Sequence, residues 1–407
     1  MLKILHISTH KIGGAGNAAY RLHLALNEAN VVNSKFLYRS QDSSNIPKEN
    51  SISQGKHLIH HRIANQLGFP ILAWHKNRKI INSLQGKFEK ISFPENDFEV
   101  EKHPWVKEAD IIHLHWISDF INFPSFFKAL KNKPMVWTFH DMYAFKGLFH
   151  YEEDEQRNIE SFRQVDAGIK AIKEKAIQEI LQLKIVCPSQ WLAKISNQSP
   201  LFAHQPIAII PYSLPTFWFD LQDREKARER FGLVPNLCTL LFVALDIDIE
   251  RKGLKLIIEA LKELPKGKFQ LFIVGNRDYD FGEHHVVKTG YISSELEMRA
   301  AYAAADAYLL PSREDNLPNV MLEAFAQGVP VISFKNGGMA DWISDGFNGY
   351  LCKDIDASAL AQQINKFMLE RDRFNREQIN AFALKHFSPE QQSSAYEFLY
   401  QNLIKES

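Results

Sequence analysis

The sequence predicts an α/β protein built from two doubly wound, Rossmann-like domains. Three observations lead to this prediction. The chain has 407 residues, which is long for one domain and suits two. Short apolar runs typical of buried strands alternate with segments of helical apolar period. The first strand-like run, residues 2–8, is followed by a glycine-rich loop, THKIGGAG, and a helical pattern over residues 17–29, as in a nucleotide-binding α/β unit.

The composition excludes several classes of function. Lys plus Arg and Asp plus Glu number 48 each, so the chain has no global basic field and we expect no nucleic-acid partner. The three cysteines are far apart and lack metal-binding spacing, which suggests a reducing compartment. The apolar start is too short for a signal peptide, and no apolar run reaches the length of a membrane span. We therefore expect a soluble cytoplasmic enzyme.

The first half of the chain supplies one parallel sheet. After the second strand, VVNSKFLYRS, the expected strands are residues 109–116, 134–140 and 184–187. A charged helical region occupies residues 152–183, with an apolar helical period over its second half. Pro211 and Pro215 stiffen the chain after the last of these strands, which puts a domain boundary near residue 211.

The glycine loop is open to two interpretations. Gly14, Gly16 and Ala19 satisfy the G-x-G-x-x-A pattern of dinucleotide sites. The second strand, however, ends without the acid that holds an NAD ribose, and Arg39 is the one residue there suited to an NADP phosphate. An NAD(P)-dependent oxidoreductase is therefore an alternative function.

Residues 56–90 form a basic stretch with many apolar and aromatic side chains and one acid, Glu89. Such a stretch can lie on an anionic membrane surface, which would give a peripheral contact with the inner membrane. The interpretation we favour is a helix–loop–helix packed on the first sheet with a solvated basic face.

Polar aromatic residues follow two expected strands of the first domain. The run ADIIHLHW carries His113 and His115, and PMVWTFH ends at His140. Strand carboxyl ends are where open α/β sheets bind ligands. The histidines lack the spacing of a zinc motif, so we expect packed or hydrogen-bonded histidines and no metal site.

The second domain repeats the α/β alternation. Its expected strands are TLLFVAL, FQLFIVG, HHVVKTGYIS, AYLLP and VPVISF, and a last helix follows Ser388. Lys252 lies in an R-K-G loop that opens a helix, where a lysine offers a point charge to phosphate. The D-x-D runs at residues 246–248 and 278–280 resemble metal motifs, but we interpret both as loop acids.

Residues 311–332, PSREDNLPNVMLEAFAQGVPVI, carry the most specific pattern. A polar loop leads to a short helix that begins near Pro318 or Asn319 and stops at Gly328. Backbone N–H groups of Leu317, Asn319 and Val320 at this helix start would attract a phosphate. Glu323, one turn further, can accept hydrogen bonds from sugar hydroxyls. The segment thus predicts a site for a nucleotide sugar.

Asp315 and Glu323, eight positions apart within this context, resemble the E-x7-E signature of family 4 retaining glycosyltransferases with the GT-B fold. The resemblance implies two Rossmann-like domains facing a central cleft: residues 1–210 on the acceptor side and 211–385 on the donor side. Residues 386–407 would form a helix that crosses back to the first domain. Asp315 replaces the usual first Glu, and the region before Lys252 lacks an Arg that the family often has, so a non-catalytic nucleotide-sugar-binding protein is a further alternative.

The resemblance also implies roles for individual residues. Lys252 would bind the donor diphosphate, with Arg251 in place of the missing upstream Arg. Asp315 would approach the transferred sugar or the phosphates, and His140 would reach the same sugar as a hydrogen-bond partner. The remaining implied positions are Gly13 and Gly14 facing the diphosphate, Gly290 and Tyr291 flanking the base, and His115, Trp116 and Asp141 on the acceptor side.

The expected reaction transfers a sugar from a nucleotide-diphosphate sugar to a glycan or lipid-linked acceptor, with retention of anomeric configuration. Lys252 and the helix start after Pro318 would stabilise the charge that grows on the diphosphate. No cofactor or metal is expected for that task. The setting that the resemblance implies is bacterial surface-polysaccharide synthesis.

Overall fold

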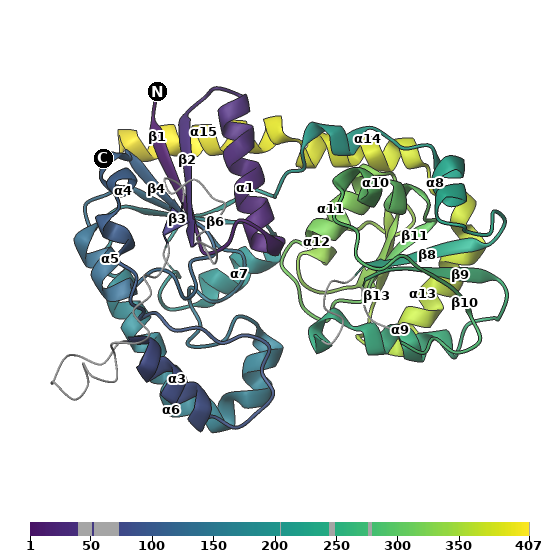
Figure 1. Ribbon diagram of the computed structural model, residues 1–407, viewed down its shortest axis with the longest axis horizontal. Helices are drawn as coiled ribbons and strands as arrows, with labels where there is room; N and C mark the ends of the chain where they lie inside the picture. The colour runs from purple at the N-terminus through teal and green to yellow at the C-terminus, as the bar shows by residue number, and fades with distance from the viewer. Residues whose placement is uncertain (40–50, 53–72, 204, 244–248, 276–278, 407) are drawn as a thin grey trace. The chain divides into compact units, whose positions relative to one another are not determined.

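The computed structural model describes residues 1–39, 51–52, 73–203, 205–243, 249–275 and 279–406. Its contacts divide the chain into two compact units. Unit 1 comprises residues 1–210 together with 393–407, and unit 2 comprises residues 211–392. The chain therefore passes from the first unit to the second between Ile210 and Pro211, and its last residues return to the first (Figure 1).

Unit 1 is built on a parallel sheet in the order β3-β2-β1-β4-β5-β6-β7. The direction of strand addition reverses between β1 and β4, and ligands of such sheets bind beyond the carboxyl ends at this switch point. The strands are β1 (Lys3–Ser8), β2 (Asn33–Arg39), β3 (Ser51–Ile52), β4 (Ile111–Leu114), β5 (Met135–Thr138), β6 (Leu183–Cys187) and β7 (Ile207–Ile209).

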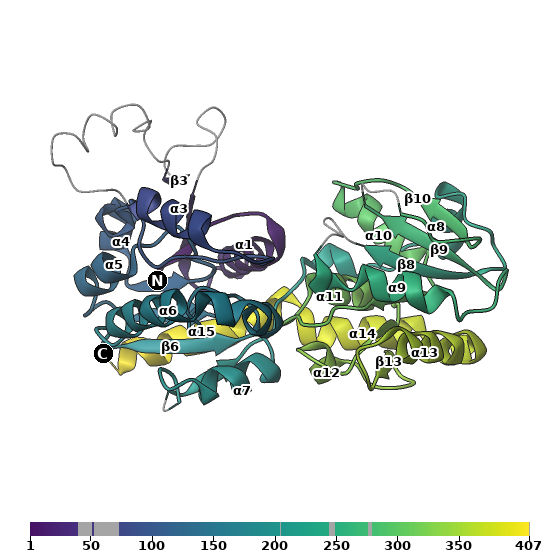
Figure 2. The ribbon, with the colours of Figure 1, turned by 90° about the horizontal axis from the view of Figure 1, so that it is seen from below.

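Helices cover both faces of this sheet (Figure 2). Alternate strand residues point to opposite faces, so Ile4 packs with Leu22 and Tyr396 while Leu5 belongs to the core that contains Phe126. The first face is covered by α1 and α15, and the second by α5, α6 and α7. The helices are α1 (Gly13–Glu28), α3 (Ala73–Ser83), α4 (Pro104–Glu108), α5 (Phe123–Ala129), α6 (Glu152–Ile177), α7 (Gln190–Gln198) and α15 (Pro389–Lys405), with the 3-10 turn η1 (Val100–Lys102).

Unit 2 is built on a second parallel sheet in the order β10-β9-β8-β11-β12-β13. Its switch point lies between β8 and β11. The strands are β8 (Cys238–Val243), β9 (Phe269–Val274), β10 (His285–Lys288), β11 (Ala307–Leu310), β12 (Val331–Phe334) and β13 (Gly349–Cys352). The two sheets confirm the prediction of two doubly wound, Rossmann-like domains.

The helices of unit 2 also flank both sides of the sheet. One core joins Ile257 of α9 and Ile364 of α13 to Leu309 of β11, while α11 packs against α14. The helices are α8 (Arg224–Arg230), α9 (Leu254–Leu261), α10 (Glu295–Ala303), α11 (Asn319–Ala326), α12 (Met339–Trp342), α13 (Ala357–Glu370) and α14 (Arg376–Phe387), with the 3-10 turns η2 (Thr216–Phe219), η3 (Glu250–Lys252) and η4 (Arg371–Arg373).

Two local predictions were wrong. The first helix begins at Gly13 and not at Asn17, so Gly13 and Gly14 lie in its first turn rather than in a loop. Residues 346–352, which are not among the strands expected from the sequence, contain strand β13. Gly349 opens this strand where a Cβ would lie 2.0 Å from the carbonyl oxygen of Val331, so glycine here permits close strand pairing.

The basic stretch of residues 56–90 is described from Ala73 onward, and its part up to residue 72 lies outside the described residues. None of the residues of α3 is buried. Asp97 accepts hydrogen bonds from the backbone N–H groups of Ala73 and Trp74 at 2.9 and 3.1 Å, and Ile80 packs against the core. Within the described chain, no helix combines the length and the apolar character needed to cross a bilayer.

Candidate functional site

The loops that follow β8 and β11 meet at the switch point of unit 2. The backbone N–H of Arg313, after β11, donates to the carbonyl oxygen of Arg251, after β8, at 2.7 Å. The side chain of Asn336, after β12, donates to the carbonyl oxygen of Arg313. Three consecutive strands of the sheet thus send their loops to one place, the place where an open α/β sheet binds its ligand.

A compact charged group occupies this place. Lys252 Nζ lies 2.6 Å from Asp315 Oδ2, and Arg251 Nη1 lies 3.5 Å from the same oxygen. The backbone N–H of Asn316 donates to the other carboxylate oxygen at 3.0 Å. Burial by itself raises the pKa of Asp315, but Lys252 and Arg251 outweigh it and the net pKa lies below the ordinary value. Asp315 is therefore an anion that holds two cations at the switch point.

The two basic residues differ in their surroundings. Arg251 is 7% exposed and donates to the carbonyl oxygen of Glu314 at 2.7 Å, which fixes the loop after β11. The Lys252 side chain is 32% exposed and reaches solvent beside Asp315. An ammonium carries three donors, so Lys252 can keep Asp315 and still donate to a ligand.

Two glycines allow these loops to approach one another. Gly253 has φ +73°, and a Cβ there would lie 1.9 Å from the carbonyl oxygen of Pro311. Gly337 has φ +56°, and a Cβ there would lie 2.1 Å from the carbonyl oxygen of Asp315. Any side chain at either position would push the loop away from its partner. The glycine of the R-K-G pattern is therefore required by packing as well as by its left-handed backbone.

Helix α11 carries the other predicted donor residues. It begins at Asn319 after Pro318, as expected, and Gly328 with φ +69° follows its end. Leu317 is buried, while Asn319 and Val320 in the first turn are partly exposed. Glu323 accepts a hydrogen bond from the hydroxyl of Tyr302 in α10 at 3.1 Å. Sequence reasoning missed Tyr302, which lies in an alanine-rich helix where it looked like an ordinary core residue.

Gly290 and Tyr291 lie apart from the charged group along the sheet. They follow β10, and the N–H of Gly275 after β9 donates to the carbonyl oxygen of Gly290 at 3.0 Å. Tyr291 is 56% exposed, so its ring offers an open aromatic face. This face suits stacking with a planar ligand group.

Unit 1 has a corresponding arrangement at its own switch point between β1 and β4. The backbone N–H of Thr9 donates to the carbonyl oxygen of Trp116 at 2.7 Å, and the hydroxyl of Thr9 donates to the carbonyl oxygen of Ser118 at 2.7 Å. Gly13 and Gly14 in the first turn of α1 are exposed, and a Cβ at either would meet open space. Gly16 is the tightly packed glycine, because a Cβ there would lie 2.7 Å from the carbonyl oxygen of His10.

The structure brings the predicted acceptor-side residues and His140 together beyond β4 and β5. His115 Nδ1 lies 3.2 Å from His140 Nε2, and Trp116 Nε1 donates to Asp141 Oδ2 at 2.7 Å. Burial lowers the pKa of His140 to about 4, against the opposing effect of Asp141. At neutral pH His140 is therefore an uncharged imidazole.

Residues that the sequence did not single out fix Asp141. His150 Nδ1 lies 2.6 Å from Asp141 Oδ2, and His150 Nε2 lies 2.9 Å from Ser92 Oγ. Burial raises the pKa of Asp141, but His150 and the donors from Tyr143 and Trp116 outweigh it and the net pKa is low. Ser92 and His150 are 0% and 1% exposed, so this Ser–His–Asp arrangement orients Asp141 and offers no nucleophile to a substrate.

One group of histidines in the described chain has the proximity of metal ligands. Ring nitrogens of His6, His113 and His115 all lie within 4.8 Å of one another. His113 bonds Tyr400 at 2.6 Å and Thr138 at 2.8 Å through its two nitrogens, so both are already engaged. The D-x-D run at residues 246–248 and Asp278 of the second run lie outside the described residues.

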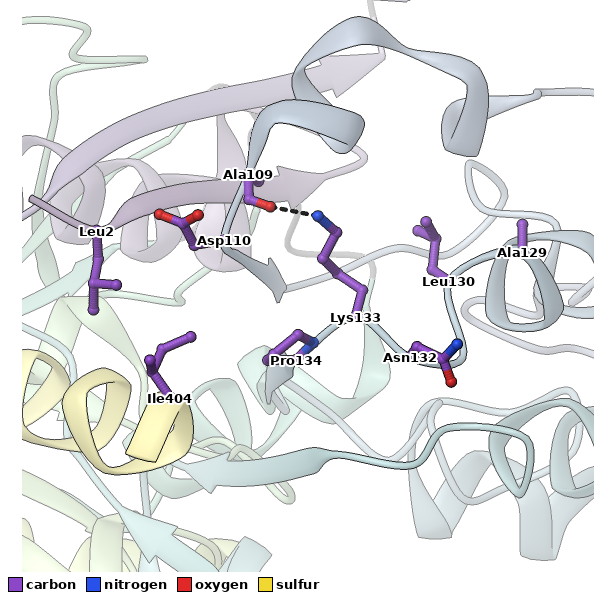
Figure 3. A pocket seen from close by; sticks show the side chains of 9 residues that line it. All are labelled: Leu2, Ala109, Asp110, Ala129, Leu130, Asn132, Lys133, Pro134 and Ile404. Carbon is purple, nitrogen blue, oxygen red and sulfur yellow. Dashed lines mark hydrogen bonds between the residues drawn. The ribbon is translucent and has the colours of Figure 1, made fainter. Parts of the chain in front are cut away.

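A pocket of about 590 Å³ lies at the opposite end of the unit 1 sheet, where β4 and β5 begin (Figure 3). Leu2, Pro134 and Ile404 line it, and Lys133 Nζ donates to the carbonyl oxygen of Ala109 at 2.6 Å. None of the predicted site residues lines this pocket.

Two parallel-sheet Rossmann-like units with polar groups at both switch points define the class of fold, which is the GT-B fold of glycosyltransferases. Sucrose-phosphate synthase of Thermosynechococcus elongatus is similar over 100% of both chains, with a TM-score of 0.68 and 17% identity. HepE of Anabaena, solved in complex with UDP-glucose, is similar over 98% of this chain and 100% of its own, with a TM-score of 0.62 and 16% identity.

Part of unit 2 matches a known protein family. Residues 238–370 match the family described as Glycosyl transferases group 1. The lipopolysaccharide core biosynthesis glycosyltransferase LpsE of Rhizobium meliloti is 29% identical over 157 residues, which are 36% of this chain and 46% of LpsE. The chain spans about half the length of the curated relatives it matches.

Proposed function

We propose that the protein is a retaining glycosyltransferase that moves a sugar from a nucleotide-diphosphate sugar to a glycan or lipid-linked acceptor. The observation that carries the proposal is the group formed by Lys252, Asp315 and the start of α11 at the switch point of unit 2. It combines a partly exposed ammonium with a helix start, and both favour phosphate. The complex of HepE with UDP-glucose and the name of LpsE support a nucleotide-sugar donor and a surface-polysaccharide setting.

Within this proposal Lys252 and the first turn of α11 bind the diphosphate and stabilise its growing charge as the glycosidic bond to the donor breaks. Asp315 already accepts from Lys252 and Asn316, so it acts by holding the ammonium in position. Glu323 accepts hydrogen bonds from the ribose hydroxyls, and Tyr302 orients its carboxylate. Tyr291 stacks on the base. The stabilisation requires no metal, and the enzyme works on the cytoplasmic side.

In unit 1 the proposal assigns His140 to the transferred sugar. The residues at the carboxyl ends of β4 and β5, His115, Trp116 and Asp141, form the acceptor side. Gly13 and Gly14 present the open first turn of α1, which suits close approach of an anionic group.

The first test is thermal stabilisation of the full chain by UDP, GDP, ADP, NAD and NADP. A ligand at a hundredfold excess over its Kd stabilises the fold by about 2.7 kcal/mol, which raises the Tm of a domain of the size of unit 2 by about 5–10 °C. We expect one nucleoside diphosphate to raise the Tm of the wild type by this amount and to raise the Tm of Glu323→Gln clearly less. Glu259→Gln, an exposed glutamate of α9, is the matched control.

The same panel separates the alternatives. Stabilisation by NAD or NADP alone would identify an oxidoreductase and contradict the proposal. Stabilisation by a nucleoside diphosphate without turnover of any matching nucleotide sugar, tested with glycan and lipid-linked acceptors, would identify a binding protein.

A further inference from the structure

Three imidazoles from adjacent strands form one hydrogen-bonded line in unit 1. His6 Nδ1 in β1 lies 2.9 Å from His115 Nε2, and His115 Nδ1 lies 3.2 Å from His140 Nε2. His115 follows directly on β4 and His140 lies two residues after β5; β1, β4 and β5 are neighbours in the sheet. The line runs from the sheet interior to the carboxyl end, where His140 belongs to the proposed site.

All three rings are uncharged at neutral pH. His6 and His115 are 0% and 2% exposed, and His6 stacks on Phe36 with ring centroids 6.4 Å apart. Burial lowers the pKa of His6 and His115 well below the ordinary value and that of His140 to about 4. Each ring therefore carries one hydrogen and one lone pair, and each contact in the line needs one of each.

Only two arrangements of the hydrogens satisfy both contacts. In the first, every Nδ1 carries the hydrogen, His6 donates to His115, and His115 donates to His140. In the second, every Nε2 carries the hydrogen and both bonds run the other way. The two arrangements differ at the ends of the line: the first leaves a bare Nε2 on His6, and the second leaves an N–H there.

The buried end of the line decides between them. His6 Nε2 is buried and has no hydrogen-bond partner among the described residues. A buried N–H without an acceptor is costlier than a buried lone pair without a donor, and such N–H groups are rare in proteins. The first arrangement is therefore favoured, and it places the hydrogen of His140 on Nδ1, the nitrogen that does not face His115.

We propose that His115, at the centre of a line that ends at His6, is a positioning residue that fixes His140 as the Nδ1–H tautomer. His140 then acts as a neutral hydrogen-bond donor toward an oxygen of the bound nucleotide sugar and not as a proton acceptor. The tautomer follows from the line alone. The identity of the oxygen that receives the bond rests on the proposed function.

His113 stands outside this line although its ring lies beside those of His6 and His115, with centroids 4.7 and 4.1 Å away. Its two nitrogens bond Tyr400 and Thr138, and Thr138 in turn bonds the hydroxyl of Tyr396 at 2.8 Å. Hydroxyl groups both donate and accept, so this branch imposes no direction on the line.

The direct test is ¹⁵N NMR of the full chain labelled at histidine, because protonated and bare ring nitrogens of neutral imidazole have well-separated shifts. The signals are assigned by the loss of each set in single His→Asn variants. We expect His6, His115 and His140 all to carry hydrogen on Nδ1 at pH 7.5. A hydrogen on Nε2 of His140 would overturn the proposal, whether or not any sugar transfer is detected.

Two variants of His115 test its positioning role. His115→Asn keeps an amide donor near the place of Nδ1, and His115→Gln moves the amide to the place of Nε2 and removes the hydrogen bond from residue 115 to His140. We expect His140 to keep the Nδ1–H tautomer in the first variant and to lose it in the second. If His140 keeps its tautomer in His115→Gln, the assignment of His115 is wrong.

Turnover adds a separate readout once a donor is known. We expect kcat of His115→Gln to fall about tenfold with KM nearly unchanged, and His115→Asn to stay within about threefold of the wild type. If kcat falls equally in both variants and in parallel with Tm, the role of His115 is merely structural and the proposal is overturned. Equimolar bound metal in the purified protein would also overturn it, because a metal on these nitrogens displaces the shared hydrogens.

Discussion

At the residue scale, the pair formed by Lys252 and Asp315 concentrates the chemistry of unit 2. Asp315 is the more enclosed partner, with its side chain 13% exposed against 32% for Lys252. A buried carboxylate requires its cations, whereas a partly exposed ammonium can add a ligand. The resemblance implies that Asp315 approaches the transferred sugar or the phosphates, and in the structure its oxygens bond Lys252 and Asn316.

Lys252→Ala tests the diphosphate site. A hydrogen bond to a charged group contributes about 1.5–3 kcal/mol, so we expect kcat/KM to fall about 10- to 100-fold and stabilisation by the nucleoside diphosphate to shrink. Lys255→Ala, three residues on and exposed, controls for the loss of a positive charge. Arg251 remains 3.5 Å from Asp315, which limits the loss of folding stability. Wild-type turnover in Lys252→Ala would contradict the site.

Gly253→Ala tests the close approach of the two loops. Gly253 and Gly267 have nearly equal φ values, +73° and +72°, but a Cβ at Gly267 would meet open space. The backbone strain of a left-handed alanine costs about 1–2 kcal/mol at both positions. We expect urea unfolding to show that loss for Gly267→Ala and a clearly larger loss for Gly253→Ala, with weaker nucleotide binding only in the latter. Equal losses of the free energy of unfolding in the two variants would mean that the loop moves to accommodate the added methyl group.

At the element scale, α15 covers part of one face of the first sheet. Its hydroxyl groups bond buried polar groups of the sheet: Tyr400 bonds His113, and Tyr396 bonds Thr138, which in turn bonds the other ring nitrogen of His113. Tyr396, Tyr400 and Leu403 are at most 1% exposed, while Phe398 on the other side of the helix is 68% exposed. The helix therefore joins unit 1 through both apolar burial and buried hydrogen bonds.

Tyr400→Phe tests this attachment. The change leaves a buried nitrogen of His113 without its partner, which costs about 1–3 kcal/mol. We expect the midpoint of urea unfolding to fall, while nucleotide affinity in unit 2 stays unchanged. Phe398→Ala is the control on the exposed side, with a change within about 0.5 kcal/mol. A loss of nucleotide affinity in Tyr400→Phe would contradict this separation.

At the scale of the whole molecule, the buried neutral histidines of unit 1 make folding depend on pH. Burial lowers the pKa of His23 and His140 to about 4 and that of His6, His113 and His115 well below the ordinary value. Below about pH 6.5 the unfolded chain takes up protons that the folded chain excludes. The free energy of unfolding must therefore fall as pH falls, and it is unaffected by these groups above that pH.

Urea unfolding at pH 7.5 and 5.5 measures this effect. Each such histidine lowers the free energy of unfolding by up to about 1.4 kcal/mol per pH unit between pH 6.5 and 4. Carboxylates contribute little in the upper part of this window because their ordinary pKa values lie near 4. His6→Phe removes one titrating group. The free energy of unfolding of this variant should therefore fall less steeply as pH falls, by the contribution of one proton. An unchanged slope in that variant would mean that His6 is charged in the fold.

Much of unit 2 could be predicted from its sequence because its signals are local. The R-K-G turn, the loop before Pro318 and the glycine after α11 each specify their own backbone within a few residues, and the structure places them as expected. For the strand that the sequence analysis missed, the deciding contact was distant. Strand β13 forms because residues 349–352 pair with β12, which the glycine-rich sequence itself does not reveal.

The sequence by itself determined the alternation of strands and helices and the loop with Asp315 that leads into the helix with Glu323. The spacing of apolar residues and the residues that form turns are properties of neighbouring positions in the chain. Only the tertiary structure decided that His6 would face His115, 109 positions away, and that α15 would cover the first sheet. Strand order sets which side chains share a face, and that order depends on the packing of the whole unit.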